Sequence, residues 1–166
     1  MFLIKWENII KNINQAKERM IDLQLRDIMT NQVVYVSPET PVEQVAQLMQ
    51  KHNVGSIPVC DQNGNIRGIV TDRDIVVRNV AYGTDAKTLK ASDVMTSQVT
   101  MAEPSMSISE ASRMMAERQV RRLPVVENNR LVGMVALGDL AVNGRTDMEA
   151  AEALSDISTP SKAQKL

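Results

Sequence analysis

The chain carries an internal repeat, which restricts its fold more than any other feature. The tetrapeptide Asp-Ile-Met-Thr at 27–30 returns as Asp-Val-Met-Thr at 93–96, 66 positions later. Other pairs agree at this spacing, or at 65 positions after a one-residue deletion in a turn: Val33 and Val99, Pro38 and Pro104, Val54 and Val120, Pro58 and Pro124, Val59 and Val125, Gly68 and Gly133, Val70 and Val135, Asp74 and Asp139. Two copies of one supersecondary unit therefore fill residues 24–143.

The first half of each copy predicts an extended segment and an amphipathic helix. The extended segments are 33–36 and 99–101. Apolar residues then recur at spacings of three and four, as on one face of a helix: Val42, Val45, Ala46 and Met49 in copy one, and Ile108, Ala111 and Met115 in copy two. A capping box is expected at the start of each helix, from Thr40 with Glu43 and from Ser107 with Glu110.

The second half of each copy predicts a hairpin and a closing helix. Apolar runs at 57–60 and 66–70 flank a polar turn in copy one, and runs at 123–126 and 131–135 do so in copy two. The closing helix is clearest at 75–81. Each copy is thus a βαββα unit of class α+β. One such unit buries too little surface to be stable alone, so we expect the two to pack about a pseudo-twofold axis.

The domain organisation follows from these limits. We expect an N-terminal amphipathic helix at 1–22, repeat one at 23–82, a linker at 83–90, repeat two at 91–143 and a partly disordered C-terminal extension at 144–166. The N-terminal stripe is interrupted by Lys17 and consists of Leu3, Trp6, Ile10, Ile13 and Met20. Because its polar face carries both charge signs, we favour oligomerisation over membrane contact.

Composition excludes several classes of function. The net charge is -1, from 19 basic and 20 acidic side chains, and so supplies no global field for nucleic acid or anionic lipid. Cys60 is the only cysteine and His52 the only histidine, which argues against an intrachain disulfide, a zinc site and a catalytic triad. No stretch resembles a signal peptide or a membrane span. We therefore expect a cytoplasmic protein that is not an enzyme and binds neither membrane nor nucleic acid.

The doubled order of motifs points to one family. Asp-hydrophobic-Met-Thr, hydrophobic-Pro-Val and the run GIVTDRDI at 68–75, which recurs in altered form at 133–140, resemble the cystathionine-beta-synthase-type (CBS) domain pair, or Bateman module, of the free-standing bacterial type. This resemblance implies a non-catalytic regulatory module. Relatives bind AMP, ATP, S-adenosylmethionine or related adenosyl compounds such as ADP or NAD in a cleft between the repeats. It also implies a homodimer and a regulated partner protein.

Thr71 and Asp74 are the candidate ligand residues of copy one. An ionised carboxylate only accepts hydrogen bonds, so Asp74 can take both hydroxyl protons of a ribose, while the Thr71 hydroxyl and free helix amides suit phosphate oxygens. The alternative is a helix cap alone, which stabilises a helix by about 1 kcal/mol. The resemblance implies that the base packs against Val34, Ile57 and Pro58 in copy one and against Thr100, Leu123 and Pro124 in copy two. The alternative for these six is a core role.

Copy two departs from the pattern. Ala136 stands where the threonine should be, although Asp139 can still receive a ribose. Copy two also has Arg121 and Arg122 before its strand proline, and with Arg73 they form a basic group that could hold phosphate through charge-assisted bonds. The alternative is surface ion pairing. We therefore predict a nucleotide-responsive regulatory module, and the competing interpretation is a ligand-free scaffold or stress-associated interaction module.

Overall fold

The computed structural model describes residues 23–142 and 147–158, whose contacts divide them into two compact units. One unit contains residues 31–101 and 126–133. The other contains the described parts of 1–30, 102–125 and 134–166. The expected N-terminal helix at 1–22 and the tail from residue 159 lie outside the described residues.

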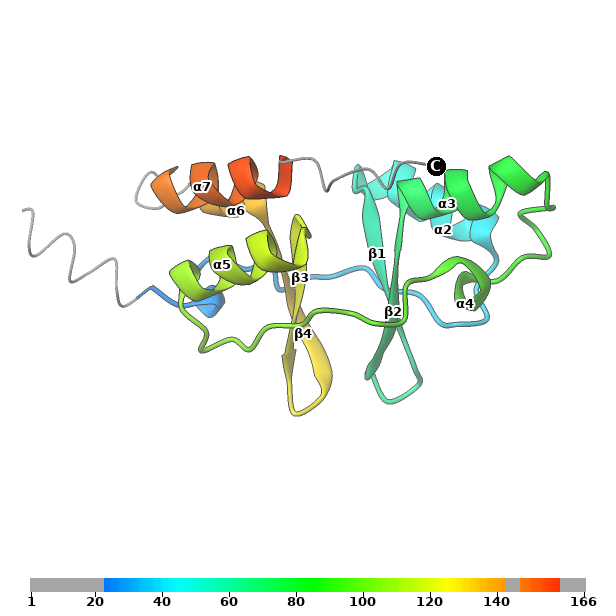
Figure 1. Ribbon diagram of the computed structural model, residues 1–166. Coiled ribbons are helices and arrows are strands. Elements are labelled where there is room, and N and C mark those ends of the chain that lie inside the picture. Colours follow the sequence, from blue (N-terminus) through cyan, green and yellow to red (C-terminus); the bar gives the residue numbers. More distant parts are fainter. Residues whose placement is uncertain (1–22, 143–146, 159–166) are drawn as a thin grey trace, which may run out of the picture. The chain divides into compact units, whose positions relative to one another are not determined.

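Repeat one is a two-stranded antiparallel hairpin with helices packed on it (Figure 1). Its elements are α2 (Val42–His52), β1 (Ser56–Cys60), β2 (Ile66–Thr71), α3 (Asp72–Arg78) and η2 (Val80–Tyr82). Helix α4 (Ala91–Val94), which opens repeat two, packs on α2, β2 and α3. In the register Ser56 lies opposite Thr71 and Ile57 opposite Val70. The core between helices and hairpin is aliphatic and consists of Val36, Val42, Val45, Met49, Ile57, Val59, Val70, Ala91 and Val94.

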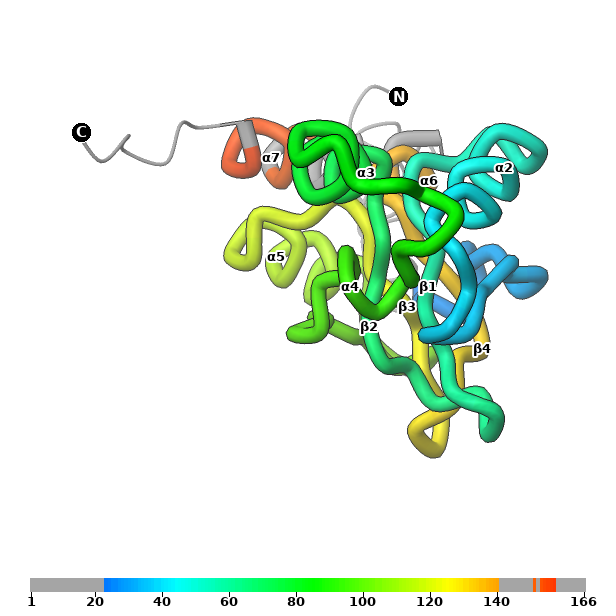
Figure 2. Tube along the Cα trace, turned by 90° about the vertical axis from the view of Figure 1, so that its right-hand side faces the viewer, coloured from blue at the N-terminus to red at the C-terminus, as the bar shows by residue number. Residues whose placement is uncertain are grey.

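Repeat two has the same plan and one additional helix. Its elements are α5 (Ile108–Arg118), β3 (Arg122–Glu127), β4 (Arg130–Ala136) and α6 (Leu137–Val142). Asn128 and Asn129 both have positive φ, 50° and 65°, as a two-residue hairpin turn requires. The additional helix α7 (Asp147–Ser158) lies against α5 and α6 (Figures 1 and 2).

The segment that opens each repeat is bonded to the hairpin of the other repeat. Thr30 pairs with Met134 in β4, and Thr96 pairs with Ile69 in β2. Gly68 makes the second pairing possible, because a Cβ there would lie 2.4 Å from Met95 Sδ and 3.0 Å from the Thr96 carbonyl. The short 3-10 helix η1 (Leu25–Asp27) accordingly packs with repeat two, where the Leu25 amide donates to the Met106 carbonyl at 2.9 Å.

These elements confirm the predicted α+β class and the βαββα order. The first strand of each βαββα repeat is reduced to a single parallel bridge, Val36 with Val59 in repeat one and Ala102 with Val125 in repeat two. No helix within the described ranges is long and apolar enough to cross a bilayer.

Two local predictions for α2 are wrong. Thr40 does not cap this helix, since the amides of Val42 and Glu43 donate to the carbonyls of Leu89 and Ala86, at 2.9 Å each. Backbone from outside the helix therefore replaces the side-chain cap. Ala46 is exposed and lies outside the core. In repeat two, Ser107 Oγ does accept from the Glu110 amide at 3.2 Å, which confirms the Ser107 cap, but the Glu110 side chain does not accept from the Ser107 amide in return, so the predicted box is only half formed.

Candidate functional site

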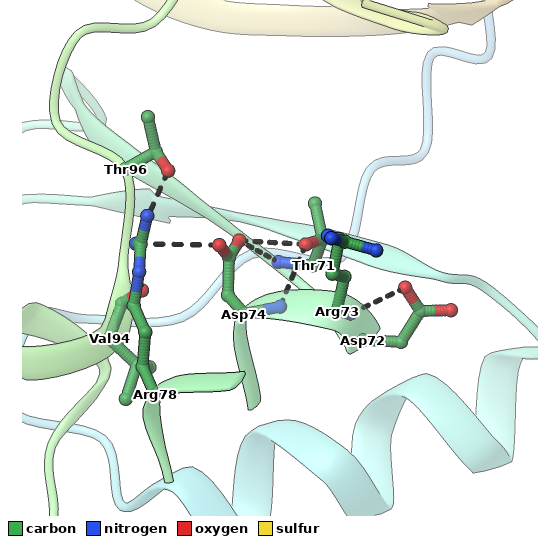
Figure 3. Close-up of polar contacts among 7 residues, drawn as sticks. All are labelled: Thr71, Asp72, Arg73, Asp74, Arg78, Val94 and Thr96. Atoms are coloured by element: carbon green, nitrogen blue, oxygen red, sulfur yellow. Dashed lines mark hydrogen bonds and ion pairs between the residues drawn. The ribbon is translucent and has the colours of Figure 1, made fainter. Parts of the chain in front are cut away.

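The turn from β2 into α3 holds Thr71 and Asp74 in a closed capping box (Figure 3). Asp74 Oδ2 accepts from the Thr71 backbone amide at 2.8 Å and from the Thr71 hydroxyl at 2.7 Å. In return, Thr71 Oγ1 accepts from the Asp74 amide at 3.1 Å. The cap is therefore formed, and it fixes the orientation of the carboxylate.

The second oxygen of Asp74 faces a cation. Arg78 Nη1 lies 3.4 Å from Asp74 Oδ1 and donates to the Val94 carbonyl at 2.6 Å and to Thr96 Oγ1 at 3.3 Å (Figure 3). The Asp74 side chain is 14% exposed. Because a carboxylate oxygen can accept more than one hydrogen bond, Oδ1 keeps acceptor capacity for a ligand hydroxyl.

The apolar candidates of repeat one lie on β1 and on the segment that precedes α2. Ile57 and Pro58 are buried in β1. The preceding residue, Ser56, lies opposite Thr71 in the hairpin. Val34 is half-buried in the segment whose Val36 amide donates to the Pro58 carbonyl at 3.0 Å. Ile57 also belongs to the hydrophobic core, so its core role is realised.

Repeat two keeps the carboxylate and loses the hydroxyl. Asp139 Oδ2 accepts from the Ala136 amide at 2.7 Å, as Asp74 does from Thr71. The Arg121 carbonyl accepts from the Leu137 amide at 2.9 Å, which brings Arg121 to this turn. Leu123 and Pro124 are buried in β3, and Thr100 is half-buried in the segment leading to Ala102, whose amide donates to Pro124.

The three candidate arginines differ in exposure. Arg73 and Arg121 are exposed, whereas Arg122 is half-buried at the start of β3. Within the described part of the chain none of them forms a salt bridge, so the alternative of surface ion pairing is not realised there. Arg73 follows Asp72, whose Oδ1 accepts from the Arg73 amide at 2.7 Å.

Sequence reasoning missed Arg78. Its partners Val94 and Thr96 lie 16 and 18 positions away, so only the tertiary structure brings them together. The local signal was the spacing of four from Asp74, which places opposite charges on one helix face.

Cys60 is buried at the end of β1. Burial raises the pKa of the Cys60 thiol to about 11, and the Asp61 carboxylate adds to this shift. The thiol is therefore protonated and unreactive at neutral pH. Over residues 23–142 and 147–158, no three His, Cys, Asp or Glu side chains are grouped as a metal site.

The fold, the doubled turn and the exchanged opening segments define a tandem pair of similar units, and a family model identifies the units. The CBS domain model matches residues 25–79 and 91–143, which is more than half of the chain. The chain therefore belongs to the CBS domain family and carries two copies of the domain.

Known proteins similar to the chain agree with this assignment. The CBS domain-containing protein YhcV of Bacillus subtilis is 48% identical over 134 residues, which cover 81% of this chain and 94% of YhcV. The crystal structure of Hypoxic Response Protein I with two coordinated zinc ions is 36% identical, with a TM-score of 0.68, and the match covers 72% of this chain and 98% of that one.

A more distant structure shares the fold. The CBS domain pair of protein MJ0100, solved in complex with 5′-methylthioadenosine and S-adenosyl-L-methionine, is 23% identical with a TM-score of 0.67. The match covers 74% of this chain and 99% of that one. It extends the agreement in fold across most of both chains.

Proposed function

We propose that this chain is a non-catalytic regulatory module that binds an adenosyl ligand at the turn from β2 into α3. The Asp74 carboxylate accepts hydrogen bonds from the ribose hydroxyls, and Val34, Ile57 and Pro58 contact the base. Ligand occupancy is then read by a partner protein through its different affinity for the two states.

The observation that carries this proposal is the fixed Asp74 carboxylate. Two bonds from Thr71 hold Oδ2, at 2.7 and 2.8 Å, while among the described residues Oδ1 has only the 3.4 Å contact with Arg78. A carboxylate that is oriented before the ligand arrives loses less entropy on binding. The adenosyl ligands of the MJ0100 pair support the choice of ligand class.

Arg78 connects the ligand-binding carboxylate of Asp74 to the segment that opens repeat two. A ribose hydroxyl at Asp74 Oδ1 competes with the long Arg78 contact, and the same guanidinium holds Val94 and Thr96. Thr96 is bonded to Ile69 in β2 through both its amide and its carbonyl. Ligand binding thus changes the anchoring of the segment that opens repeat two.

A titration with several ligands tests this function. The purified chain is titrated by calorimetry with AMP, ATP, NAD, S-adenosylmethionine and 5′-methylthioadenosine, after a mass spectrum has identified any small molecule retained through purification. We expect saturable binding of at least one adenosyl compound and none of a pyrimidine nucleotide such as CMP. No binding of any adenosyl compound at millimolar concentration removes the proposal.

A ligand-free scaffold is the second candidate, because both Asp74 and Asp139 already serve as caps and Ala136 lacks a hydroxyl. Under that function a partner is captured equally with and without nucleotide. Under the adenosyl-sensing function, the ligand found by titration changes partner capture.

A further inference from the structure

Helix α3 and the turn η2 that follows it present three exposed valines, which we call the valine ridge. Val76, Val77 and Val80 are 56%, 48% and 65% exposed, whereas Ile75 packs against the core of repeat one. Val76 and Val77 precede Val80 by four and three residues, so the three side chains share one side of the helix. A helix that is apolar on two sides is normally buried on both, and a contiguous exposed apolar patch marks a protein–protein contact.

Asn79 holds the valine ridge in a fixed position. The residue is 3% exposed, its amide donates to the Ile75 carbonyl at 3.0 Å, and its Nδ2 donates to the Thr84 carbonyl at 2.6 Å. The Thr84 amide donates back to the Asn79 carbonyl at 3.4 Å. These bonds attach η2 to the end of α3, so Val80 is oriented before a partner arrives and docking costs little conformational entropy.

A groove between α5 and α7 of repeat two has room for such a ridge. The two helices lie side by side (Figure 1), and the groove has a volume of about 550 Å³. Ala116 and Ala153 are among its lining residues, and small side chains of this kind leave space for branched aliphatic ones. Glu117 and Asp156 also line the groove and are exposed at its rim.

The charges beside the ridge and the groove are complementary. Arg73 precedes Val76 by three residues and Val77 by four, so it lies on the same side of α3 as the ridge. Arg73 is exposed and forms no salt bridge with any described residue. Asp156 on the groove is likewise exposed and, over residues 23–142 and 147–158, has no salt-bridge partner. Opposite charges placed in this way fix the register of an interface.

The internal repeat assigns the ridge and the groove to different repeats. The groove residues Ala116 and Glu117 correspond, 66 positions earlier, to Gln50, which is larger, and to Lys51, which reverses the charge. Helix α6, the equivalent of α3, is itself in contact with α7. Repeat one therefore has the ridge without the groove, and repeat two has the groove without the ridge. A second copy of the chain supplies the missing half of each, and a contact about a twofold axis occurs twice in such a dimer.

We propose that the valine ridge of one copy docks into the groove between α5 and α7 of a second copy, with Arg73 of the ridge paired with Asp156 of the groove. The dimer is then held by two identical ridge–groove contacts. Nothing in this proposal depends on the adenosyl ligand.

Cross-linking of two different variants tests the position of the ridge. The full chain with Val77→Cys and a mass-tagged full chain with Ala116→Cys are mixed and treated with a short bis-maleimide, and Cys60 is retained because it is buried. We expect a cross-link between the two chains, at least tenfold faster than when Gln50→Cys replaces Ala116→Cys. Gln50 is the exposed equivalent of Ala116 on α2. Equal rates, or no cross-link between the two chains, overturn the proposal.

Sedimentation equilibrium tests the apolar contact independently. We expect the unmodified chain to dimerise and Val77→Asp to raise the dissociation constant at least tenfold. The matched control is Leu154→Asp, because Leu154 is also exposed, at 50%, and lies on α7 but does not line the groove. A monomeric unmodified chain, or equal losses in the two variants, contradicts the proposal.

A charge exchange tests the ion pair. Arg73→Glu and Asp156→Arg should each weaken the dimer at least threefold, because each places like charges together. The double variant restores the opposite charges and should regain most of the lost affinity. Losses that add in the double variant would show that Arg73 and Asp156 do not meet.

Discussion

The Oδ2 atom of Asp139 accepts a hydrogen bond from the Ala136 amide at 2.7 Å. The equivalent bond in repeat one, from Thr71 to Asp74, is accompanied by two bonds of the Thr71 hydroxyl, at 2.7 and 3.1 Å. The repeats therefore share the carboxylate and differ in the hydroxyl, and only repeat one closes the full box.

Restoring the hydroxyl should stabilise repeat two. In Ala136→Thr the new Oγ can accept from the Asp139 amide, which should add about 1 kcal/mol to the free energy of unfolding. For a chain of this size, such a gain raises the melting temperature by about 2–4 °C in a calorimetric scan. The control is Ala136→Val, which adds the branch without the hydroxyl, and an equal gain in both variants would exclude the cap as its cause.

A side chain at residue 68 should disrupt the passage of segment 95–96 over β2. Gly68→Ala places a methyl group 2.4 Å from Met95 Sδ and 3.0 Å from the Thr96 carbonyl, so it should cost about 1–3 kcal/mol in urea denaturation. Gly138→Ala is the matched control, since nothing lies within 4 Å of a Cβ there and alanine favours a helix. A stable Gly68→Ala variant would show that segment 95–96 can move away from β2.

Loss of the Arg78 guanidinium should loosen segment 94–96. Arg78→Ala removes the bonds to Val94 and Thr96 and should lower the free energy of unfolding by about 1–2 kcal/mol. Hydrogen exchange at the Thr96 amide, which donates to Ile69 at 2.9 Å, should accelerate. Arg113→Ala removes only an exposed pair 4.0 Å long and should change neither quantity.

Alkaline pH should destabilise the fold through Cys60. The thiol pKa is about 11 in the folded chain and 9.0 without burial, so the unfolded chain loses this proton first as pH rises. The contribution is fully present below pH 9 and is lost between pH 9 and pH 11, on the order of 3 kcal/mol. Urea denaturation from pH 8 to 11 measures the slope, and Cys60→Ala should have a shallower one. Identical slopes would mean that other groups cause the loss.

Local patterns predicted the fold well because each copy repeats the same short-range signals. The apolar runs at 57–60 and 123–126 became β1 and β3, and the Thr71–Asp74 spacing became a capping box. These features depend on neighbours within a few residues.

The remaining features depend on residues far apart in the sequence. The cap predicted at Thr40 is not formed, because the first amides of α2 donate instead to the carbonyls of Ala86 and Leu89, more than 40 residues away in the sequence. Arg78 and the exchange of opening segments depend on tertiary contacts that no local pattern encodes. The ligand contact of Asp74 stays a prediction, made from the chemistry of its carboxylate and from the family resemblance, and the structure adds the orientation of that carboxylate.

Comparison of ligand affinities tests the central claim most directly. The dissociation constant of whichever adenosyl compound binds is measured for the unmodified chain, for Asp74→Asn and for Asp139→Asn. Asparagine keeps an oxygen that can accept from Thr71 but loses the charge that holds ribose hydroxyls. We predict at least a tenfold loss for Asp74→Asn and less than a twofold change for Asp139→Asn. An affinity that survives in a folded Asp74→Asn variant would show that the ligand binds elsewhere.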